Sequence, residues 1–300
     1  MIKSVTVTNH LGESLVLELT RPDLSGFIVK EIDGLGPVKA NINTTKRATA
    51  DGTAYNSAYL NQRDITFQLQ FYTTGAESIE DIRHRSYKYF PLKKQVTIRV
   101  ETDNRISEAT GYVESNEPNI FSSVEGCTVV VACPDPYFYS HETNETIFYG
   151  VEPTFEFPLF NNSSTEALLQ MGVVKNKTEE NVFNSGDAEV GLSIILHATG
   201  DVTNVTIYNL DTREQMVLDT SKIPENSILE GDTITINTTL GNKSISLLRQ
   251  GEMINILNCV SKNSKWFTLH KGDNPFAYKA ESGAEHLQFR MENKVAYIGV

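Results

Sequence analysis

"TTKRATADGTAYNSAYLNQRDITFQLQFY", residues 44–72, joins two segments of opposite character. Its second part, "DITFQLQFY", alternates apolar and polar side chains, which is typical of a half-buried β-strand. Its first part, "TTKRATADGTAYNSAYL", contains no Val, Leu, Ile or Met before Leu60. Residues 44–59 therefore offer a hydrophobic core little to bury, and they need another role.

Asp51-Gly52, near the middle of this segment, predicts a tight hairpin turn, since a type I′ turn requires positive φ at both central positions. The flanking residues 44–50 and 53–59 are equal in length and predict a two-stranded arm. An isolated hairpin is only marginally stable in water, so such an arm has to dock on another surface. Its alanines permit close backbone approach, and further contacts are expected from Lys46, Arg47, Tyr55 and Tyr59. A flexible surface loop is the alternative interpretation.

The rest of the first half predicts an antiparallel sheet or sandwich, because short alternating runs are separated by turn residues. These runs are "SVTVT", "SLVLEL", "GFIVKEI", "ITFQLQFY", "VTIRV", "TGYVES" and "CTVVVAC". One helix is predicted between them in "ESIEDIRHRSYKYFP". There, Ser78 is the N-cap with Asp81 three residues later, Ile79 and Ile82 begin an apolar stripe, and Pro91 ends the helix.

The second half predicts another β-sandwich, of jelly-roll or lectin-like kind. Its runs are "EVGLSIILHA", "NVTIYNL", "MVLD", "DTITINTT", "SISLL", "WFTLHKGDN", "HLQFRM" and "VAYIGV". "CPDPYFYS" closes the first half with two prolines. We therefore expect two domains, residues 1–140 and residues 141–300, with the boundary in the Pro- and Asn-containing stretch near residues 134–150.

The formal net charge of −12 argues against a protein that binds nucleic acid through its phosphates, because such binding needs clustered Lys and Arg. Residues 1–140 hold 14 basic and 17 acidic side chains, whereas residues 141–300 hold 12 and 21, so the acidity lies mainly in the second half. The first twenty residues alternate like a strand and lack a signal-peptide pattern. No run approaches the roughly 18 apolar residues of a membrane span. We expect synthesis in a cytoplasm and no membrane anchoring.

The three cysteines are Cys127, Cys133 and Cys259. On one extended strand, Cys127 and Cys133 would lie about 20 Å apart, beyond disulfide reach, so buried reduced thiols are expected.

The search for catalytic motifs indicates no enzyme, no cofactor and no metal site. Zinc-protease, nucleophile-elbow and P-loop patterns are absent, and the six histidines are scattered singly. A pair of carboxylates for glycoside hydrolysis cannot be established from the sequence. In the second half, Trp266, Phe267, Phe276 and Tyr278 could form a sugar-stacking platform, although core positions are the favoured interpretation.

The arm and its surroundings resemble the distal tail (Dit) proteins of siphophage-type tails from phages of Gram-positive bacteria. The resemblance is strongest over residues 26–72, where it rests on Gly34, Gly36 and Pro37, then Asp51, Gly52, Tyr55 and Asn56, then Arg63. "CPDPYFYS" is similar to the end of the family's first domain. The pieces "NSGDAEVGLSIILHATGDVTNVTIYN", "EGDTITINTTLGNKSI" and "WFTLHKGDNPFAY" resemble its C-terminal module, with Lys271 where Pro is usual.

The resemblance implies a structural protein of a phage tail or phage-derived particle, assembled in the bacterial host cytoplasm. It implies a hexameric ring that joins the tail tube protein to the tail-tip or tail-associated lysin protein, with DNA passing through the lumen unbound. The second, galectin-like domain is expected to hold a receptor-binding protein or to contact host wall sugars, for which Trp266 and Tyr278 are the weak candidates. The implied oligomer interface comprises Lys46, Arg47, Asp51, Gly52, Tyr55, Asn56, Tyr59 and Arg63.

Two alternatives stay open from the sequence. One is a carbohydrate-binding adhesin, in which the second sandwich is the working part. The other is a glycosidase, which would depend on two specific carboxylates.

Overall fold

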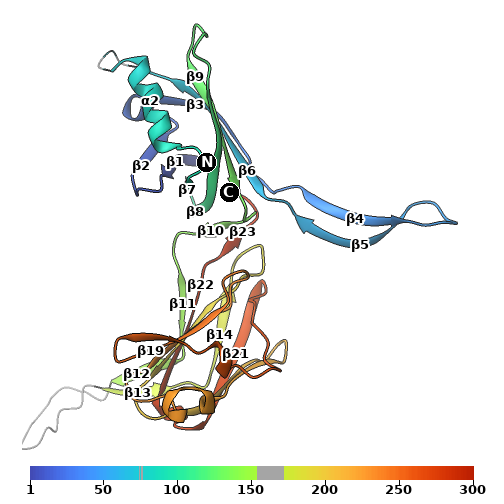
Figure 1. Cartoon of the computed structure of the whole chain (residues 1–300), viewed down its shortest axis with the longest axis vertical. Coiled ribbons are helices and arrows are strands. Elements are labelled where there is room, and N and C mark those ends of the chain that lie inside the picture. Colours follow the sequence, from blue (N-terminus) through green and yellow to red (C-terminus); the bar gives the residue numbers. More distant parts are fainter. Residues whose placement is uncertain (74, 76, 154–171) are drawn as a thin grey trace, which may run out of the picture. The chain divides into compact units, whose positions relative to one another are not determined.

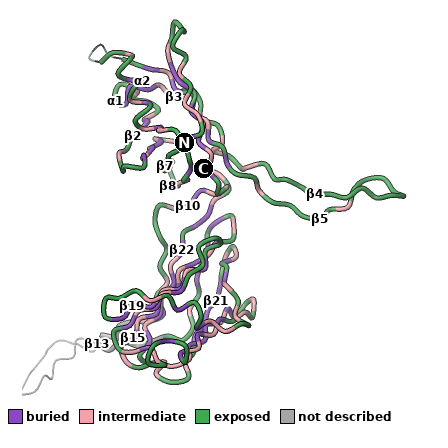
Figure 2. The backbone as a smooth tube through the Cα atoms, viewed as in Figure 1, coloured by how far each residue is buried: buried purple, intermediate pink, exposed green. Residues whose placement is uncertain are grey.

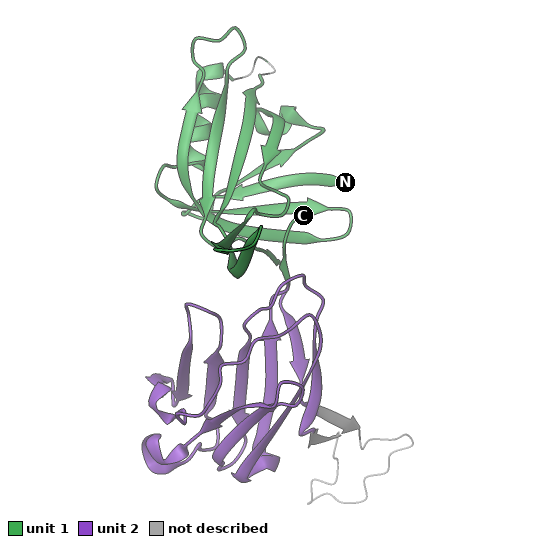
Figure 3. Cartoon of the chain, turned by 90° about the vertical axis from the view of Figure 1, so that its right-hand side faces the viewer, with its two compact units in different colours: residues 1–141, 296–300 green, residues 142–295 purple. Residues whose placement is uncertain are grey.

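The computed structural model describes residues 1–73, 75, 77–153 and 172–300. The chain forms two compact units (Figure 3). Unit 1 comprises Met1–His141 together with Ala296–Val300, and unit 2 comprises Glu142–Val295. The sequence interpretation placed residues 296–300 in the second domain, but the structure places them in the first.

Unit 1 is built on one antiparallel sheet of nine strands. Seven follow the order β2-β1-β7-β8-β9-β6-β3, and β10 and β23 lie off this path (Figure 1). The bounds are β1 (Ile2–Thr8), β2 (Ser14–Glu18), β3 (Phe27–Asp33), β6 (Arg63–Phe71), β7 (Gln95–Thr102), β8 (Ile106–Pro118), β9 (Gly126–Cys133), β10 (Phe138–Ser140) and β23 (Ala296–Tyr297).

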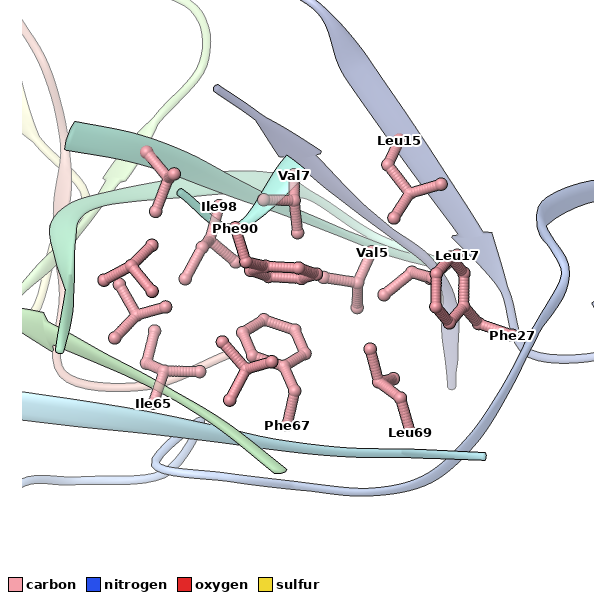
Figure 4. Close-up of a cluster of buried hydrophobic side chains, with 14 of the residues drawn as sticks. Val5, Val7, Leu15, Leu17, Phe27, Ile65, Phe67, Leu69, Phe90 and Ile98 are labelled. Carbon is pink, nitrogen blue, oxygen red and sulfur yellow. The ribbon is translucent and has the colours of Figure 1, made fainter. Parts of the chain in front are cut away.

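The two ends of this sheet bury their apolar faces in one shared core. Val5 and Leu17, from the β2–β1 end, belong to the same buried cluster as Phe67 and Leu69 of β6 (Figure 4). The burial of β6 alternates strictly along its length, which confirms the period-2 pattern of "ITFQLQF". Because each fully buried Leu or Phe stabilises a fold by about 1.5–3 kcal/mol, this cluster holds unit 1 together.

The predicted helix is confirmed as α2 (Ile79–Tyr89). Ser78 caps it in a capping box: the Asp81 N–H donates to Ser78 Oγ at 3.1 Å, and the Ser78 N–H donates to the Asp81 carboxylate at 3.1 Å. Ile82 is buried, and Phe90 packs on Phe67 with 5.5 Å between ring centroids. A second, short helix, α1 (Pro22–Ser25), was not predicted from the sequence.

The arm consists of β4 (Ala40–Lys46) and β5 (Thr53–Leu60), and it extends away from the rest of unit 1 (Figure 1). These strands pair only with each other among the described strands. The predicted arm is therefore confirmed, but its predicted turn is wrong. Lys46 pairs with Thr53, so residues 47–52 form a loop, and Gly52 (φ +91°) has a positive φ whereas Asp51 does not.

Unit 2 contains two larger sheets and a strand pair. One sheet has the order β11-β22-β15-β18-β19-β20, the other β14-β21-β16-β17, and β12 pairs with β13. The bounds are β11 (Asn144–Ile147), β12 (Tyr149–Pro153), β13 (Gly172–Asn176), β14 (Glu179–Asn184), β15 (Ser193–Ala198), β16 (Thr203–Asn209), β17 (Glu214–Leu218), β18 (Thr233–Asn237), β19 (Ser244–Arg249), β20 (Glu252–Asn255), β21 (Gly272–Ser282) and β22 (Leu287–Asn293). The described residues of unit 2 also form four 3-10 turns: Thr220–Lys222, Pro224–Asn226, Leu257–Cys259 and Ala284–His286.

An aromatic stack links the two sheets of unit 2. Tyr278 of β21 stacks on Phe289 of β22, with 4.8 Å between ring centroids and 8° between ring planes. Phe148 packs edge-on against Phe289 at 4.7 Å. Since β21 and β22 belong to different sheets, the stack forms the centre of a two-sheet sandwich, as the sequence predicted.

One strand of unit 2 differs from the prediction. "WFTLHKGDN" was expected to be a strand, but β21 begins only at Gly272 and continues through Pro275 to Ser282.

Among the described residues, no helix is long and apolar enough to cross a membrane.

Candidate functional site

The arm presents two faces of different chemistry. Residues paired across antiparallel strands share a face, so Ile42 and Ala58 lie on one face and Asn43 and Ser57 on the other. We call the first the apolar face; its members are Ala40, Ile42, Thr44, Tyr55, Ala58 and Leu60. We call the second the amide face; its members are Asn41, Asn43, Ser57 and Tyr59. Both faces are largely open to solvent (Figure 2).

Side-chain hydrogen bonds on the amide face set the register of the arm. Asn41 Nδ2 donates to Tyr59 Oη at 2.8 Å, and Asn43 Nδ2 donates to Ser57 Oγ at 3.1 Å. The register shifts between Asn43 and Thr44, which leaves Asn56 as the extra residue of a bulge. Asn56 Nδ2 donates to Thr45 Oγ1 at 2.6 Å. The polar side chains of this face thus bond to one another across the strands.

The apolar face has no such internal partners. Ile42 is 60% exposed and Tyr55 is 67% exposed, although both are large hydrophobic side chains. Exposed apolar surface of this kind on a projecting element is typical of an interaction surface. The sequence interpretation missed Ile42, because it began the arm at residue 44.

The remaining arm candidates lie where a partner could reach them. Lys46 ends β4, and Arg47, Asp51 and Gly52 lie in the loop of residues 47–52, all exposed. Lys46, Arg47 and Asp51 form no ion pair with any described residue. The tip of the arm therefore offers two cations and one carboxylate to a partner.

Arg63 requires a correction, because it is not a surface residue. Its side chain is 1% exposed, so in this chain it cannot contact a neighbouring subunit. Its guanidinium instead donates to carbonyl oxygens: to Gly34 O, to Gly36 O at 2.7 Å, to Pro136 O at 2.9 Å and to Ile298 O at 2.6 Å. It also lies 4.4 Å from the centroid of the Phe138 ring.

Burial lowers the pKa of Arg63, but an arginine pKa is so high that the group keeps its charge. That charge is compensated by the four carbonyl dipoles and by the π-face of Phe138, and no carboxylate bonds to it within the described residues. Arg63 therefore fixes three segments at one point: the root of the arm at residues 34–37, the end of β9, and the segment after unit 2.

Gly34 makes this arrangement sterically possible. Its φ is +85°, and a Cβ there would lie 2.1 Å from Asp64 O. Only glycine fits this combination of positive φ and close backbone approach. The root of the arm can therefore lie directly against β6.

The segment Ala296–Val300 contacts the same root. β23 pairs with β10, through Phe138 with Tyr297, and the Val300 N–H donates to Leu35 O at 3.0 Å. Arg105 donates to Gly299 O at 2.9 Å and lies 4.4 Å from the centroid of the Tyr297 ring. Sequence reasoning missed this contact, since no local pattern in "AYIGV" indicates its partner.

In unit 2, the structure separates the two candidates for sugar contact. Tyr278 is 3% exposed and its hydroxyl donates to Leu287 O at 3.2 Å, so it is a core residue and the prediction of a contact there is wrong. Phe267 and Phe276 are also buried, with ring centroids 5.3 Å apart. Trp266 alone of these four is partly exposed, and Lys243 Nζ lies 5.5 Å from its ring centroid.

A second buried arginine anchors a loop of unit 2. Arg249 binds Asp232, with 2.6 Å between Nη2 and Oδ2, and it also donates to Pro224 O and Ser227 O at 2.8 Å each. Both side chains are almost fully buried. This pair holds the turn at residues 224–227, in which Glu225 and Asn226 have positive φ.

No cluster suited to a metal ion occurs in the described part of the chain, where no group of three or more His, Cys, Asp and Glu comes together. The three cysteines are free and buried. Burial raises the pKa of Cys127 to about 12 and those of Cys133 and Cys259 to about 11.

We expect the native protein to be inert toward thiol reagents at neutral pH, because the thiolate is the reactive form. A chromogenic disulfide reagent should release signal from none of the three thiols in buffer and from all three in denaturant. Since the folded-state pKa values exceed the ordinary value of 9.0, the thiols favour the folded state below pH 9, and this contribution is lost as pH rises from 9 toward 12. Fast labelling of even one thiol in the native state contradicts this prediction.

Comparison with known proteins finds similarity to phage tail components. A family model described as siphovirus-type tail component, C-terminal domain, matches residues 185–292. No curated protein is similar enough in sequence to match. The crystal structure of the Dit protein of phage SPP1, described as a paradigm of the hub adsorption apparatus in phages that infect Gram-positive bacteria, covers 97% of this chain and 98% of its own, with 13% identity and a TM-score of 0.67.

A chain of the phage P2 baseplate, in its activated conformation with Ca, covers 98% of this chain and 98% of its own, with 11% identity and a TM-score of 0.54. At these identities the structural matches show the shared fold alone. The family model matches residues 185–292, and the shared fold extends along nearly the whole chain. Together these findings confirm the resemblance to the Dit proteins seen in the sequence.

Proposed function

We propose that the protein is the distal tail hub of a phage or phage-derived particle, and that it acts as a structural component without catalysis. Six copies form a ring that joins the tail tube protein to the tail-tip or tail-associated lysin protein. The protein is assembled in the host cytoplasm and resides in the virion tail. The observation that carries this proposal is the arm, a paired hairpin with an exposed apolar face and no partner among the described strands of its own chain.

The partner that we assign to the arm is a second copy of the chain. A two-stranded hairpin without a third strand or a covering layer is marginal in water, so its length is best explained by docking. In a closed ring every subunit gives one arm and receives one, so no exposed apolar face is left over. The interface proposed for the arm consists of its apolar face together with Lys46, Arg47, Asp51 and Gly52 at the tip.

The other parts of the chain fit this role. The net charge of −12 suits a lumen through which DNA passes without binding. Unit 2, which we take to be galectin-like, serves as an attachment point for a receptor-binding protein. The structural resemblance to a hub protein and to a baseplate chain supports this assignment.

Mass photometry of the purified chain tests the proposal. We expect a species at six times the 33.5 kDa chain mass, in a proportion that rises with concentration, and six-fold rings in negative-stain images. Monomers alone at every concentration contradict a self-assembling hub.

A carbohydrate-binding adhesin is the second candidate, and one observation favours it. Trp266 is partly exposed and has a cation near its ring, which is an arrangement that can stack on a sugar. Glycan-array binding that is lost in Trp266→Ala, from a protein that forms no ring, supports the adhesin. Ring formation without glycan binding rejects it.

A further inference from the structure

The contacts around Arg63 join parts of the chain that are far apart in sequence. Gly34 and Gly36 precede the arm, Pro136 follows β9, and Ile298 follows the whole of unit 2. All four give a carbonyl oxygen to the same guanidinium. Arg63 therefore lacks one of its four carbonyl acceptors until residues 296–300 are in place.

The segment after unit 2 also contacts the root through its own backbone. The Val300 N–H donates to Leu35 O at 3.0 Å, between the two glycines that bond to Arg63. A Cβ on Gly299 would lie 3.0 Å from Leu35 O and 3.3 Å from Gly36 Cα, so the two backbones are already in close contact. Arg105 also contacts this segment, through Gly299 O and the Tyr297 ring.

We propose that Arg63 and residues 296–300 form a clasp that fixes the root of the arm and thereby the direction in which the arm leaves unit 1. Arg63 acts as a positioning residue: it touches no partner but determines where the arm can reach. Residues 296–300 follow unit 2 in the sequence and are synthesised after it. The clasp can therefore form, and fix the arm for assembly, only once unit 2 has been synthesised. Copies that stop within unit 2 would carry an unfixed arm and join a ring poorly.

The first part of the proposal is tested on the monomer and does not need a ring. Gly299→Val should push residues 298–300 off the root, because the neighbouring atoms are backbone and cannot move aside cheaply. Leu92→Val is the control, since Leu92 is an exposed residue of unit 1 that takes no part in the clasp. We expect the Val300 amide to exchange with solvent about tenfold faster in Gly299→Val and at an unchanged rate in Leu92→Val.

Trypsin provides the readout for the root itself. Lys39 is exposed between the root and β4, and Arg47 is exposed in the loop of the arm, so cleavage after Arg47 is an internal reference. We expect cleavage after Lys39, relative to that after Arg47, to rise about tenfold in Gly299→Val and in Arg63→Lys. A lysine ammonium is a compact donor without the planar fork, so it cannot bond to all four carbonyls. Arg249→Lys, in unit 2, should leave this ratio unchanged.

The role of the clasp in ring assembly rests on the proposed function. A failure of the proposed function can be told apart from a failure of the clasp. If the wild-type chain forms rings, we expect Gly299→Val and Arg63→Lys to need at least tenfold higher concentration for the same ring fraction, while both controls assemble normally. If the wild-type chain forms no rings, the hub assignment fails, but the exchange and cleavage rates still decide on the clasp. Unchanged rates in both clasp variants overturn it, and a loosened root with normal ring assembly overturns its role in assembly.

Discussion

A chain that lacks residues 41–59, with the gap closed by a short Gly-Ser linker, is expected to stay folded and to form no rings at any concentration. Its unit 1 core stays intact because the deleted residues all lie outside the buried cluster. The loss of assembly should be complete rather than partial, since every subunit would lose both the arm that it gives and the arm that it receives. Circular dichroism reports the fold, and mass photometry reports the assembly.

Point variants locate the contact on one face of the arm. Ile42→Ser and Tyr55→Ser remove exposed apolar groups and should weaken assembly, because each side chain buried at an interface contributes about 1.5–3 kcal/mol. Ala54→Ser is the control, since Ala54 pairs with Thr45 on the same face as Asn43 and its side chain forms no hydrogen bond that sets the register. Rings that form as readily without the arm as with it disprove the arm as the contact, and failure of the deleted chain to fold shows that the segment is core structure.

Replacement of Arg249 by methionine should destabilise unit 2 by about 3–5 kcal/mol, because it leaves the Asp232 carboxylate buried without its ionic partner. The carbonyls of Pro224 and Ser227 lose their donor in the same step. The protein has one tryptophan, Trp266, and it lies in unit 2, so its fluorescence during denaturant unfolding reports this unit specifically.

Two further variants test whether the loss of stability comes from the unpaired charge of buried Asp232 or from the loss of an ion pair in general. Arg290→Met removes a cation bound to the exposed Glu145 at 3.0 Å, and it should change stability by about 1 kcal/mol or less. The double variant Arg249→Met with Asp232→Asn removes the buried charge and should recover part of the loss. A single variant as stable as the wild-type protein contradicts the assigned role of Arg249.

The sequence was most informative where burial alternates along one strand. "ITFQLQF" and "CTVVVAC" became β6 and β9 because each has one face that must meet a core, and a pairing shifted by one residue would expose it. The helix after Ser78 was predictable because its capping box and its terminating proline are both local signals.

The arm was only partly predictable, since its register depends on pairs of residues in different strands. Asp51-Gly52 suggested the centre of the hairpin, but the pairing of Asn41 with Tyr59 and the bulge at Asn56 place the loop at residues 47–52. Arg63 shows a further limit. The family resemblance implied that Arg63 is an interface residue, but its burial depends on carbonyls from segments more than 200 positions apart, which no local pattern reveals.

The chain enters unit 2 and leaves it again at neighbouring points. Asn144 pairs with Asn293 at its edge, while Tyr139 and Ala296 pair inside unit 1. A sandwich whose two ends emerge side by side can be excised or replaced without breaking the sheet that carries it, because β10 and β23 can be rejoined by a short turn. Residues 142–295 therefore form a segment that another domain could replace while the sheet of unit 1 stays unchanged.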